Sequence, residues 1–196
     1  MSSKKPGIRL IVGLGNPGPS YTNTRHNVGA WFVNKIADQT GITLTHQKKL
    51  KGYVAKLPTQ HPTFLFTPDT FMNLSGQAVV AAAYYYRIMP EEILIAHDEL
   101  DFPAGKVRIK FGGGHGGHNG LRDTIQHLGS KDFYRLRIGI NHPGDRNRVS
   151  QYVLSQPSQT DTLAINRCTE DATAVLDLLT QGDIDKAIFQ LHSENS

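Results

Sequence analysis

The sequence is poor in several features that would assign it to special classes of protein. Cysteine occurs once in 196 residues, as Cys168, so no internal disulfide can form and a reducing cytoplasm is expected. Cys168 lies in a segment with helical spacing, and we interpret it as a packing residue. No apolar run approaches a membrane span, and no apolar core follows the N-terminal lysines as it would in a secretory signal. These absences favour a cytoplasmic globular protein without a membrane partner.

Charge is also modest. Charged residues make up 19% of the chain and the formal net charge is +4. This mild excess is compatible with a nucleic-acid partner and does not prove one. A chain of this length is expected to form one domain over residues 1–196, with residues 1–7 flexible.

Hydrophobic periodicity predicts alternating strands and helices. A helix over 28–40 has its apolar residues on one face and should end at Gly41. The strict alternation over 106–111 and 134–140 predicts half-exposed strands. The pattern indicates a single three-layer α/β domain, with a mixed, mostly parallel twisted sheet and helices on both faces. The predicted strands cover 8–14, 52–57, 63–67, 93–96, 106–111 and 134–140, and the predicted helices 28–40, 76–87, 121–128, 158–179 and 184–191.

The most unusual segment is the run 112–120, which holds six glycines, His115, His118 and Asn119. It lies between a predicted strand and a predicted helix, where open α/β sheets place ligands. Glycine lets another backbone or a ligand approach closely. A flexible surface loop is the plain alternative.

A second glycine-rich turn, 13–18, fits the dinucleotide pattern G-x-G-x-x-G after a strand. Pro17 and Pro19 interrupt it, the next helix begins only near Asn27, and no acidic residue for a ribose follows that helix. We therefore do not expect a dinucleotide. The same loop leads to His26, which lies where loop becomes helix, a placement that suits a positioned base.

Two further segments carry candidate polar groups. In the run 70–76, Asn73 or Ser75 could cap the following helix. His97 and Asp98 end a strand, where an aspartate can hold an imidazole in one tautomer; a surface turn is the alternative. A metal site of His115 and His118 with His97 or Asp98 is conceivable, but no further motif supports it.

Basic residues alternate with apolar ones on two predicted strands. Lys106, Arg108 and Lys110 share one strand face, and Arg135 and Arg137 share a face of the other. A cationic face beside a glycine-rich loop would suit phosphates, although a merely solvated sheet face would show the same pattern.

Taken together, these segments closely resemble bacterial-type peptidyl-tRNA hydrolase. The matching stretches occur in order over most of residues 8–154, and the resemblance weakens across 41–62 and the C-terminal helices. One departure is Asn141, which stands where the family often has glycine. The matching stretches are 11–18, 24–29, 70–76, 97–101, 112–120 and 135–139.

The resemblance implies a monomeric cytoplasmic enzyme that hydrolyses the ester joining a peptide to the terminal ribose of tRNA. His26 matches the family's general base, Asp98 the carboxylate that supports it, and Asn16 the residue that distinguishes N-blocked from free aminoacyl groups. Other matches imply contacts with the substrate's end by Tyr21, Phe71, Asn73 and Asn119. Met72 and His118 match residues that line the site, and Lys110 and Arg137 match residues that bind the 5′ phosphate of tRNA.

The implied chemistry agrees with the residues present. An aminoacyl ester is already activated, so one water and one base can suffice, and amide or backbone N–H groups can stabilise an oxyanion. We therefore expect no metal ion and no organic cofactor. A non-catalytic RNA-binding module on the same basic face and a dinucleotide-dependent oxidoreductase are the alternative functions.

Overall fold

The computed structural model describes residues 5–194, so part of the segment 1–7 that was expected to be flexible lies outside it. Within the described part, Lys5 forms an ion pair of 2.6 Å with Asp185 near the C-terminus. No helix within residues 5–194 is both long and apolar enough to cross a membrane.

A seven-stranded mixed sheet forms the middle layer, in the order β2-β3-β4-β1-β5-β7-β6. The strands β4, β1, β5 and β7 run parallel to their neighbours in the centre, and the flanking pairs are antiparallel. The strands are β1 (Leu10–Gly13), β2 (Thr45–Gln47), β3 (Gly52–Leu57), β4 (Thr63–Pro68), β5 (Ile93–Glu99), β6 (Val107–Phe111) and β7 (Tyr134–Gly139).

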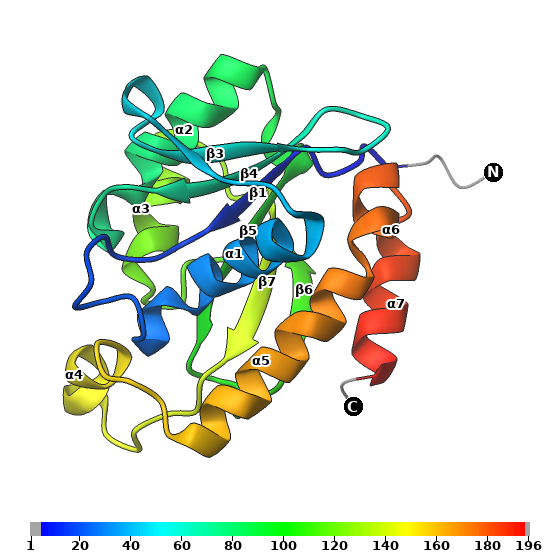
Figure 1. Cartoon of the computed structure of the whole chain (residues 1–196). Coiled ribbons are helices and arrows are strands. Elements are labelled where there is room, and N and C mark those ends of the chain that lie inside the picture. Colours follow the sequence, from blue (N-terminus) through cyan, green and yellow to red (C-terminus); the bar gives the residue numbers. More distant parts are fainter. Residues whose placement is uncertain (1–4, 195–196) are drawn as a thin grey trace.

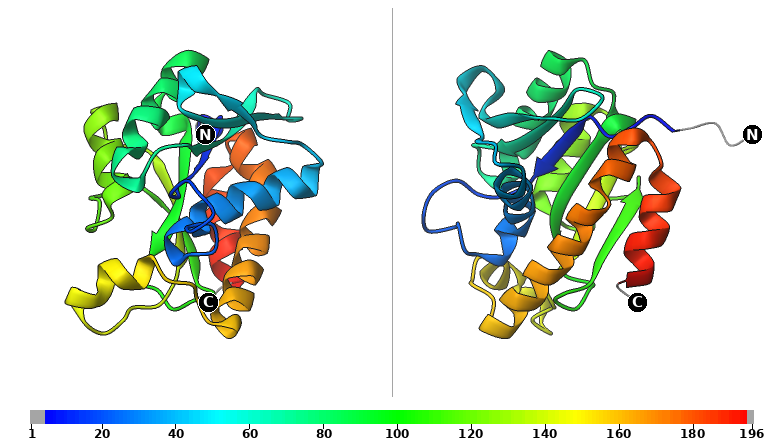
Figure 2. Two further views of the ribbon diagram at one scale, coloured as in Figure 1. Left: turned by 60° about the vertical axis from the view of Figure 1, so that its left-hand side comes forward. Right: turned by 45° about the vertical axis from the view of Figure 1, so that its right-hand side comes forward.

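Helices cover both faces of this sheet, which confirms the predicted three-layer α/β architecture (Figure 1). The helices α1, α5, α6 and α7 lie on one side and α2 and α3 on the other, as the turned views show (Figure 2). Separate hydrophobic clusters fill the two interfaces. The helices are α1 (Val28–Thr40), α2 (Ser75–Tyr86), α3 (Asn119–Leu128), α4 (Val149–Val153), α5 (Gln159–Ala174), α6 (Leu176–Gln181) and α7 (Ile184–Glu194).

Three details differ from the sequence-based expectation. The strand β7 lies between β5 and β6, so it is almost wholly buried and not half-exposed. The long C-terminal helix divides into α5 and α6 at Val175, whose φ of −100° and ψ of 6° leave the helical region. The short elements β2 and α4 were not predicted, because segments of 3 and 5 residues carry too little periodicity.

The glycine-rich turn after β1 serves packing. A Cβ on Gly13 would lie 2.3 Å from the carbonyl oxygen of Gly29 in α1, so only glycine lets this strand and helix approach so closely. Close packing therefore explains a glycine of the dinucleotide-like pattern.

The outer strand β6 is covered by the last helix. The backbone N–H of Ile109 donates a hydrogen bond of 3.0 Å to Nε2 of His192 in α7. Burial, together with the nearby Arg108, lowers the pKa of His192, which keeps its ring neutral and able to accept this bond.

Candidate active site

A cavity of about 850 Å³ opens beside the carboxyl end of β5 and the cationic face of β6 and β7. Many of the residues that the sequence singles out line it, from segments far apart in the chain. Those residues are His26, Asp98, Lys110, His118, Asn119 and Arg137.

The centre of the cavity is an imidazole and a carboxylate. His26 lies in the 3₁₀ helix η1 (Arg25–Asn27), which Arg25 fastens to the loop after α4 through a 2.6 Å bond to Oγ of Ser155. Nδ1 of His26 lies 2.8 Å and 3.0 Å from the two carboxylate oxygens of Asp98. An ionised carboxylate accepts the Nδ1 proton, so Nε2 is left with a free lone pair.

The electrostatics of this pair follow from burial and mutual charge. Burial disfavours the imidazolium of His26, but the charge of Asp98 and its hydrogen bond outweigh burial and raise the pKa of His26 above its ordinary value. Burial likewise opposes the charge of Asp98, yet His26 and His118 hold the pKa of that carboxyl well below its usual range. Asp98 therefore stays ionised while His26 can exchange a proton.

Asn16 lies on the neighbouring loop with its amide orientation fixed. Its Oδ1 accepts a 2.7 Å hydrogen bond from the backbone N–H of Met72. The side chain of Asn27 holds the main chain of Asn16 on both sides. Because Oδ1 faces Met72, the Nδ2 group of Asn16 is left as a donor.

The other residues expected at the substrate's end form the rim next to Asn16. Tyr21 and Phe71 meet edge to face with ring centroids 6.1 Å apart, and Phe71 is 53% exposed. Asn73 is exposed in the 3₁₀ helix η3 (Met72–Leu74). The cavity lining does not include Tyr21, Phe71 or Asn73, so they extend the site beyond it.

Neither Asn73 nor Ser75 caps α2, which corrects one alternative from the sequence. The hydroxyl of Ser75 donates to the carbonyl of Met72 at 2.8 Å. The N–H of Gly76 is instead bound by a carboxylate oxygen of Asp123 in α3, at 2.7 Å. The start of α2 is therefore joined to the middle of α3, and Asn73 is free of a capping role.

Asn119 begins α3 at the cavity wall. Its Oδ1 accepts a 3.0 Å hydrogen bond from Arg122 one turn later. As in Asn16, this contact leaves the amide Nδ2 as the group that a substrate oxygen can meet.

The basic residues of β6 and β7 lie on one common face of the sheet, and they differ in their interaction partners. The antiparallel register sets Arg108 opposite Arg137 and Lys110 opposite Arg135, an arrangement of like charges that is unfavourable without an anion. Arg137 is part-buried and bonds Glu99 at 2.8 Å, whereas Lys110 is exposed. Arg135 is buried and its guanidinium binds the carbonyls of Gly113 and Gly114, so it fixes the glycine-rich loop.

Asn141 adopts the left-handed conformation that a glycine would favour, with φ of 66°. Its Oδ1 accepts from the N–H of Ala104 at 2.9 Å, and its Nδ2 donates to Asp161 at 3.2 Å. Asparagine tolerates this region better than most residues. The departure from glycine is thus accommodated and adds two side-chain bonds.

The conceivable metal site of His115 and His118 does not form. Nδ1 of His115 accepts from the N–H of Gly117 two residues later. Among residues 5–194, the clustered ligand atoms belong to His26, Asp98 and His118, and both histidines already hydrogen-bond the Asp98 carboxylate.

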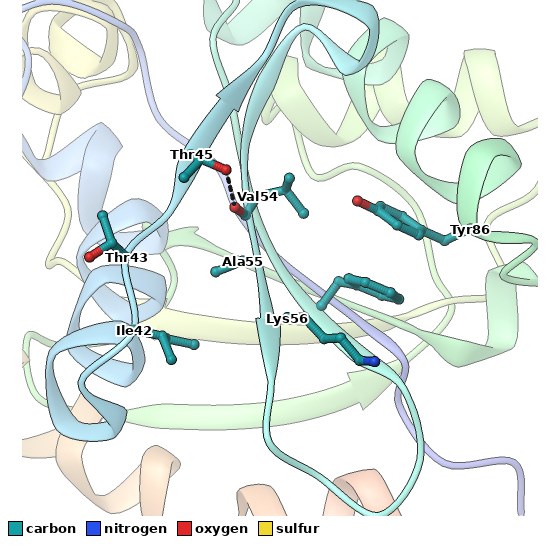
Figure 3. A pocket seen from close by; sticks show the side chains of 8 residues that line it. Ile42, Thr43, Thr45, Val54, Ala55, Lys56 and Tyr86 are labelled. Atoms are coloured by element: carbon teal, nitrogen blue, oxygen red, sulfur yellow. Dashed lines mark hydrogen bonds between the residues drawn. The ribbon is translucent and has the colours of Figure 1, made fainter.

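A second hollow, of about 400 Å³, lies beside β3 at the far edge of the sheet (Figure 3). Phe64 and Tyr86 stack there with ring centroids 3.8 Å apart, and Lys56 supplies its charge. None of the site residues expected from the sequence lines it, and it holds no acid–base pair. The cavity at His26 is therefore the candidate active site.

Sequence reasoning missed several supporting residues. It assigned no role to Asn27, Glu99 or Asp123, and it grouped Arg135 with the phosphate-binding residues. It expected His118 only to line the site, whereas its Nε2 lies 2.9 Å from Oδ1 of Asp98. The alternation of basic residues drew attention to Arg135. It could not show that Arg135 binds the glycine-rich loop, because contacts between a strand and a loop leave no periodic signal in the sequence.

Known proteins match the chain over almost its whole length. The model of the family described as Peptidyl-tRNA hydrolase matches residues 10–196. A peptidyl-tRNA hydrolase of Coxiella burnetii is 58% identical over 187 residues, covering 95% of this chain and 98% of its own, and one of Pasteurella multocida is 53% identical over 188 residues, covering 95% and 97%. The crystal structure of peptidyl-tRNA hydrolase from Acinetobacter baumannii is 47% identical and superimposes with a TM-score of 0.92 over 97% of each chain.

Proposed function

The chain belongs to the peptidyl-tRNA hydrolase family, and we propose that His26, supported by Asp98, activates the water by which it hydrolyses peptidyl-tRNA. Members of the family are hydrolases of the ester between peptide and tRNA, and they release free tRNA during translation. The observation that carries the proposal is the contact of His26 Nδ1 with the ionised Asp98, because it leaves Nε2 as a base in a cavity.

The reaction balances with this single base. Nε2 of His26 takes a proton from water while the water oxygen forms a bond to the ester carbonyl carbon. The tetrahedral intermediate then breaks its bond to the ribose oxygen, and the imidazolium returns the proton to that oxygen. The products are tRNA with a free terminal hydroxyl and a peptide carboxylic acid, which releases its remaining water-derived proton to the solvent and becomes a carboxylate. Asp98 stabilises the transient imidazolium by charge.

The amides of the site suit the remaining tasks. The Nδ2 groups of Asn16 and Asn119 remain as donors because their Oδ1 atoms already accept bonds from Met72 and Arg122. Such donors bind carbonyl oxygens and a developing oxyanion. A blocked α-amino group offers a carbonyl to Asn16, whereas a free one offers only a cation. The half-buried Tyr21 and the exposed Phe71 and Asn73 would contact the terminal nucleotides and the first residues of the peptide.

The cationic face would hold the acceptor stem. Lys110 and Arg137 both line the cavity, and a bound 5′ phosphate would relieve the repulsion among the paired basic residues. The proposed base, its carboxylate and the amide donors are complete within one chain, so the proposed reaction needs no second copy, and we propose that the protein acts as a monomer. A tRNA substrate and a single cysteine support a cytoplasmic location.

Release of N-acetyl-aminoacyl groups from tRNA by the purified protein, with a metal chelator present, tests this function. Hydrolysis of the blocked ester is expected. Binding of tRNA with the ester left intact would overturn the proposal and favour a non-catalytic RNA-binding module. Binding of NAD(P) in a titration would favour the oxidoreductase.

A further inference from the structure

His118 connects two parts of the site through the two nitrogens of one ring. Its Nδ1 accepts hydrogen bonds from the backbone N–H groups of Gly120 at 3.1 Å and Leu121 at 3.3 Å, so it is the N-cap of α3. Its Nε2 lies 2.9 Å from Oδ1 of Asp98, and its side chain is only 8% exposed. A histidine that merely lined the cavity would need neither contact.

The cap determines where the proton of the ring lies. An Nδ1 atom that accepts from two backbone N–H groups carries no proton, so the neutral ring of His118 is protonated at Nε2. That N–H then donates to Asp98. Oδ1 of Asp98 is therefore shared by two donors, His118 and His26.

We propose that His118 is a positioning residue for hydrolysis, which aligns the Asp98 carboxylate on His26 and fastens the first turn of α3, with Asn119, to this pair. The inference rests on the proposed function, since it concerns the base of that reaction. By taking part of the carboxylate's hydrogen-bonding capacity, the donor from His118 limits how strongly Asp98 favours the imidazolium of His26.

The buried titratable groups beside Asp98 other than His26 and His118 have partners away from its carboxylate. His97 of β5 donates its Nδ1 proton to the backbone carbonyl of Asp98, and burial lowers its pKa to about 3, so it is neutral. The guanidinium of Arg135 in β7 is engaged by the glycine-rich loop. At the rim, Glu99 pairs with Arg137, while Lys110, Arg122, Arg146 and Asp101 also line the cavity.

The close packing of the first turn of α3 supports the same link. A Cβ on Gly120 would lie 2.5 Å from Sδ of Met72 and 3.1 Å from Cε1 of His118. Glycine at this position thus lets the helix start against Met72, whose N–H binds Asn16, and against the ring of His118.

Two substitutions test the roles of Nδ1 and Nε2 of His118 separately. His118→Asn places a carbonyl oxygen near the former Nδ1, and asparagine is among the best N-caps, so the helix keeps its cap but loses the donor to Asp98. His118→Gln places an amide N–H near the former Nε2, so the donor is kept while the cap is weakened. His127→Asn, at the far end of α3, is the control for replacing a histidine on this helix.

The measurements are the pH dependence of kcat/KM and histidine ¹⁵N NMR of the free protein. In His118→Asn, the imidazolium of His26 gains a stronger partner, so the acidic pKa of the profile and the NMR pKa of His26 should rise by roughly half a unit. His118→Gln and His127→Asn should keep the wild-type pKa. In the wild type, NMR should show His118 protonated at Nε2 alone.

The outcomes are decisive. A wild-type pKa in His118→Asn, equal shifts in the Asn and Gln variants, or an Nδ1–H tautomer of His118 would overturn the inference and reduce His118 to a cap. Because NMR of the free protein needs no substrate, a confirmed link together with an uncleaved ester would count against the proposed function alone.

Discussion

The side chain of Asn27 forms two hydrogen bonds with the main chain of Asn16: its Oδ1 accepts from the N–H at 2.8 Å and its Nδ2 donates to the carbonyl at 2.9 Å. Asn27 directly follows His26, and it is buried. The residue expected to recognise the blocked amino group is thus held by the neighbour of the expected base. A displacement of one would displace the other.

His26→Ala is expected to lower kcat/KM on N-acetyl-aminoacyl-tRNA by about 10²–10⁴-fold, because it removes the group that we propose as the base toward water. Circular dichroism and thermal unfolding should show that the fold persists. His61→Ala, in the loop between β3 and β4, is the control and should retain activity. Near-wild-type turnover of His26→Ala would exclude it as the base.

Asp98→Asn should shift the pH profile of kcat/KM. The charge and hydrogen bond of Asp98 raise the pKa of His26, so their loss lowers that pKa and moves the acidic limb to lower pH. The maximal rate should fall, because the imidazolium in the transition state loses its partner. An acidic limb at its wild-type position would show that Asp98 does not act on His26.

Asn16→Asp should blur the selection between blocked and free aminoacyl-tRNA. The variant can still accept the N–H of Met72, but its second oxygen replaces the free Nδ2 donor and attracts an α-ammonium group. We expect the ratio of kcat/KM for N-acetyl-aminoacyl-tRNA over aminoacyl-tRNA to fall about tenfold or more, a loss of the size of one hydrogen bond to a charged group. An unaltered ratio would place the selection elsewhere.

Lys110→Ala and Arg137→Ala should raise KM for whole tRNA substrates and change kcat much less, as expected for groups that bind a distant phosphate. The wild-type advantage should shrink as salt rises. A minimal ester with only the terminal nucleoside should be cleaved equally by all three proteins, and Lys56→Ala, at the second hollow, serves as the surface control. Equal damage on the minimal ester would contradict the phosphate-binding role.

Asn141→Ala should lower the free energy of unfolding by about 1–3 kcal/mol, measured by urea denaturation. Alanine at φ of 66° is strained and makes neither side-chain bond. Asn141→Gly removes the same bonds without the strain, so its loss should be smaller. Equal stabilities of the Ala and Gly variants would show that the backbone conformation relaxes.

Much of the layer arrangement could be predicted from sequence, because strands such as β1 and β5 are continuous apolar runs and α1 has one apolar face. The near-complete burial of β7 could not be predicted, because its charged positions Arg135 and Arg137 mimic the alternation of an exposed strand. The burial of Arg135 and the partial burial of Arg137 are tolerated because glycine carbonyls bind the first and Glu99 binds the second.

The contacts within the candidate site were likewise only partly predictable from the sequence. The nearness of His26 and Asp98 could be expected, since each follows or ends a parallel strand at one edge of the sheet. The bond of His118 to Asp98 depends on the path of the glycine-rich loop, and the cap of α2 by Asp123 joins residues 47 positions apart. Neither contact leaves a trace in spacing or periodicity.

The bond from Ile109 to His192 has a consequence for how copies of this protein behave at high concentration. An open strand at the edge of a sheet is a template on which another chain can add a strand, the first step toward aggregation. At the middle of β6 that position is already occupied by an imidazole from α7, which is kept neutral by its surroundings. The helix α7 therefore blocks the addition of a strand to β6, and a chain shortened before α7 should precipitate more readily than the full one.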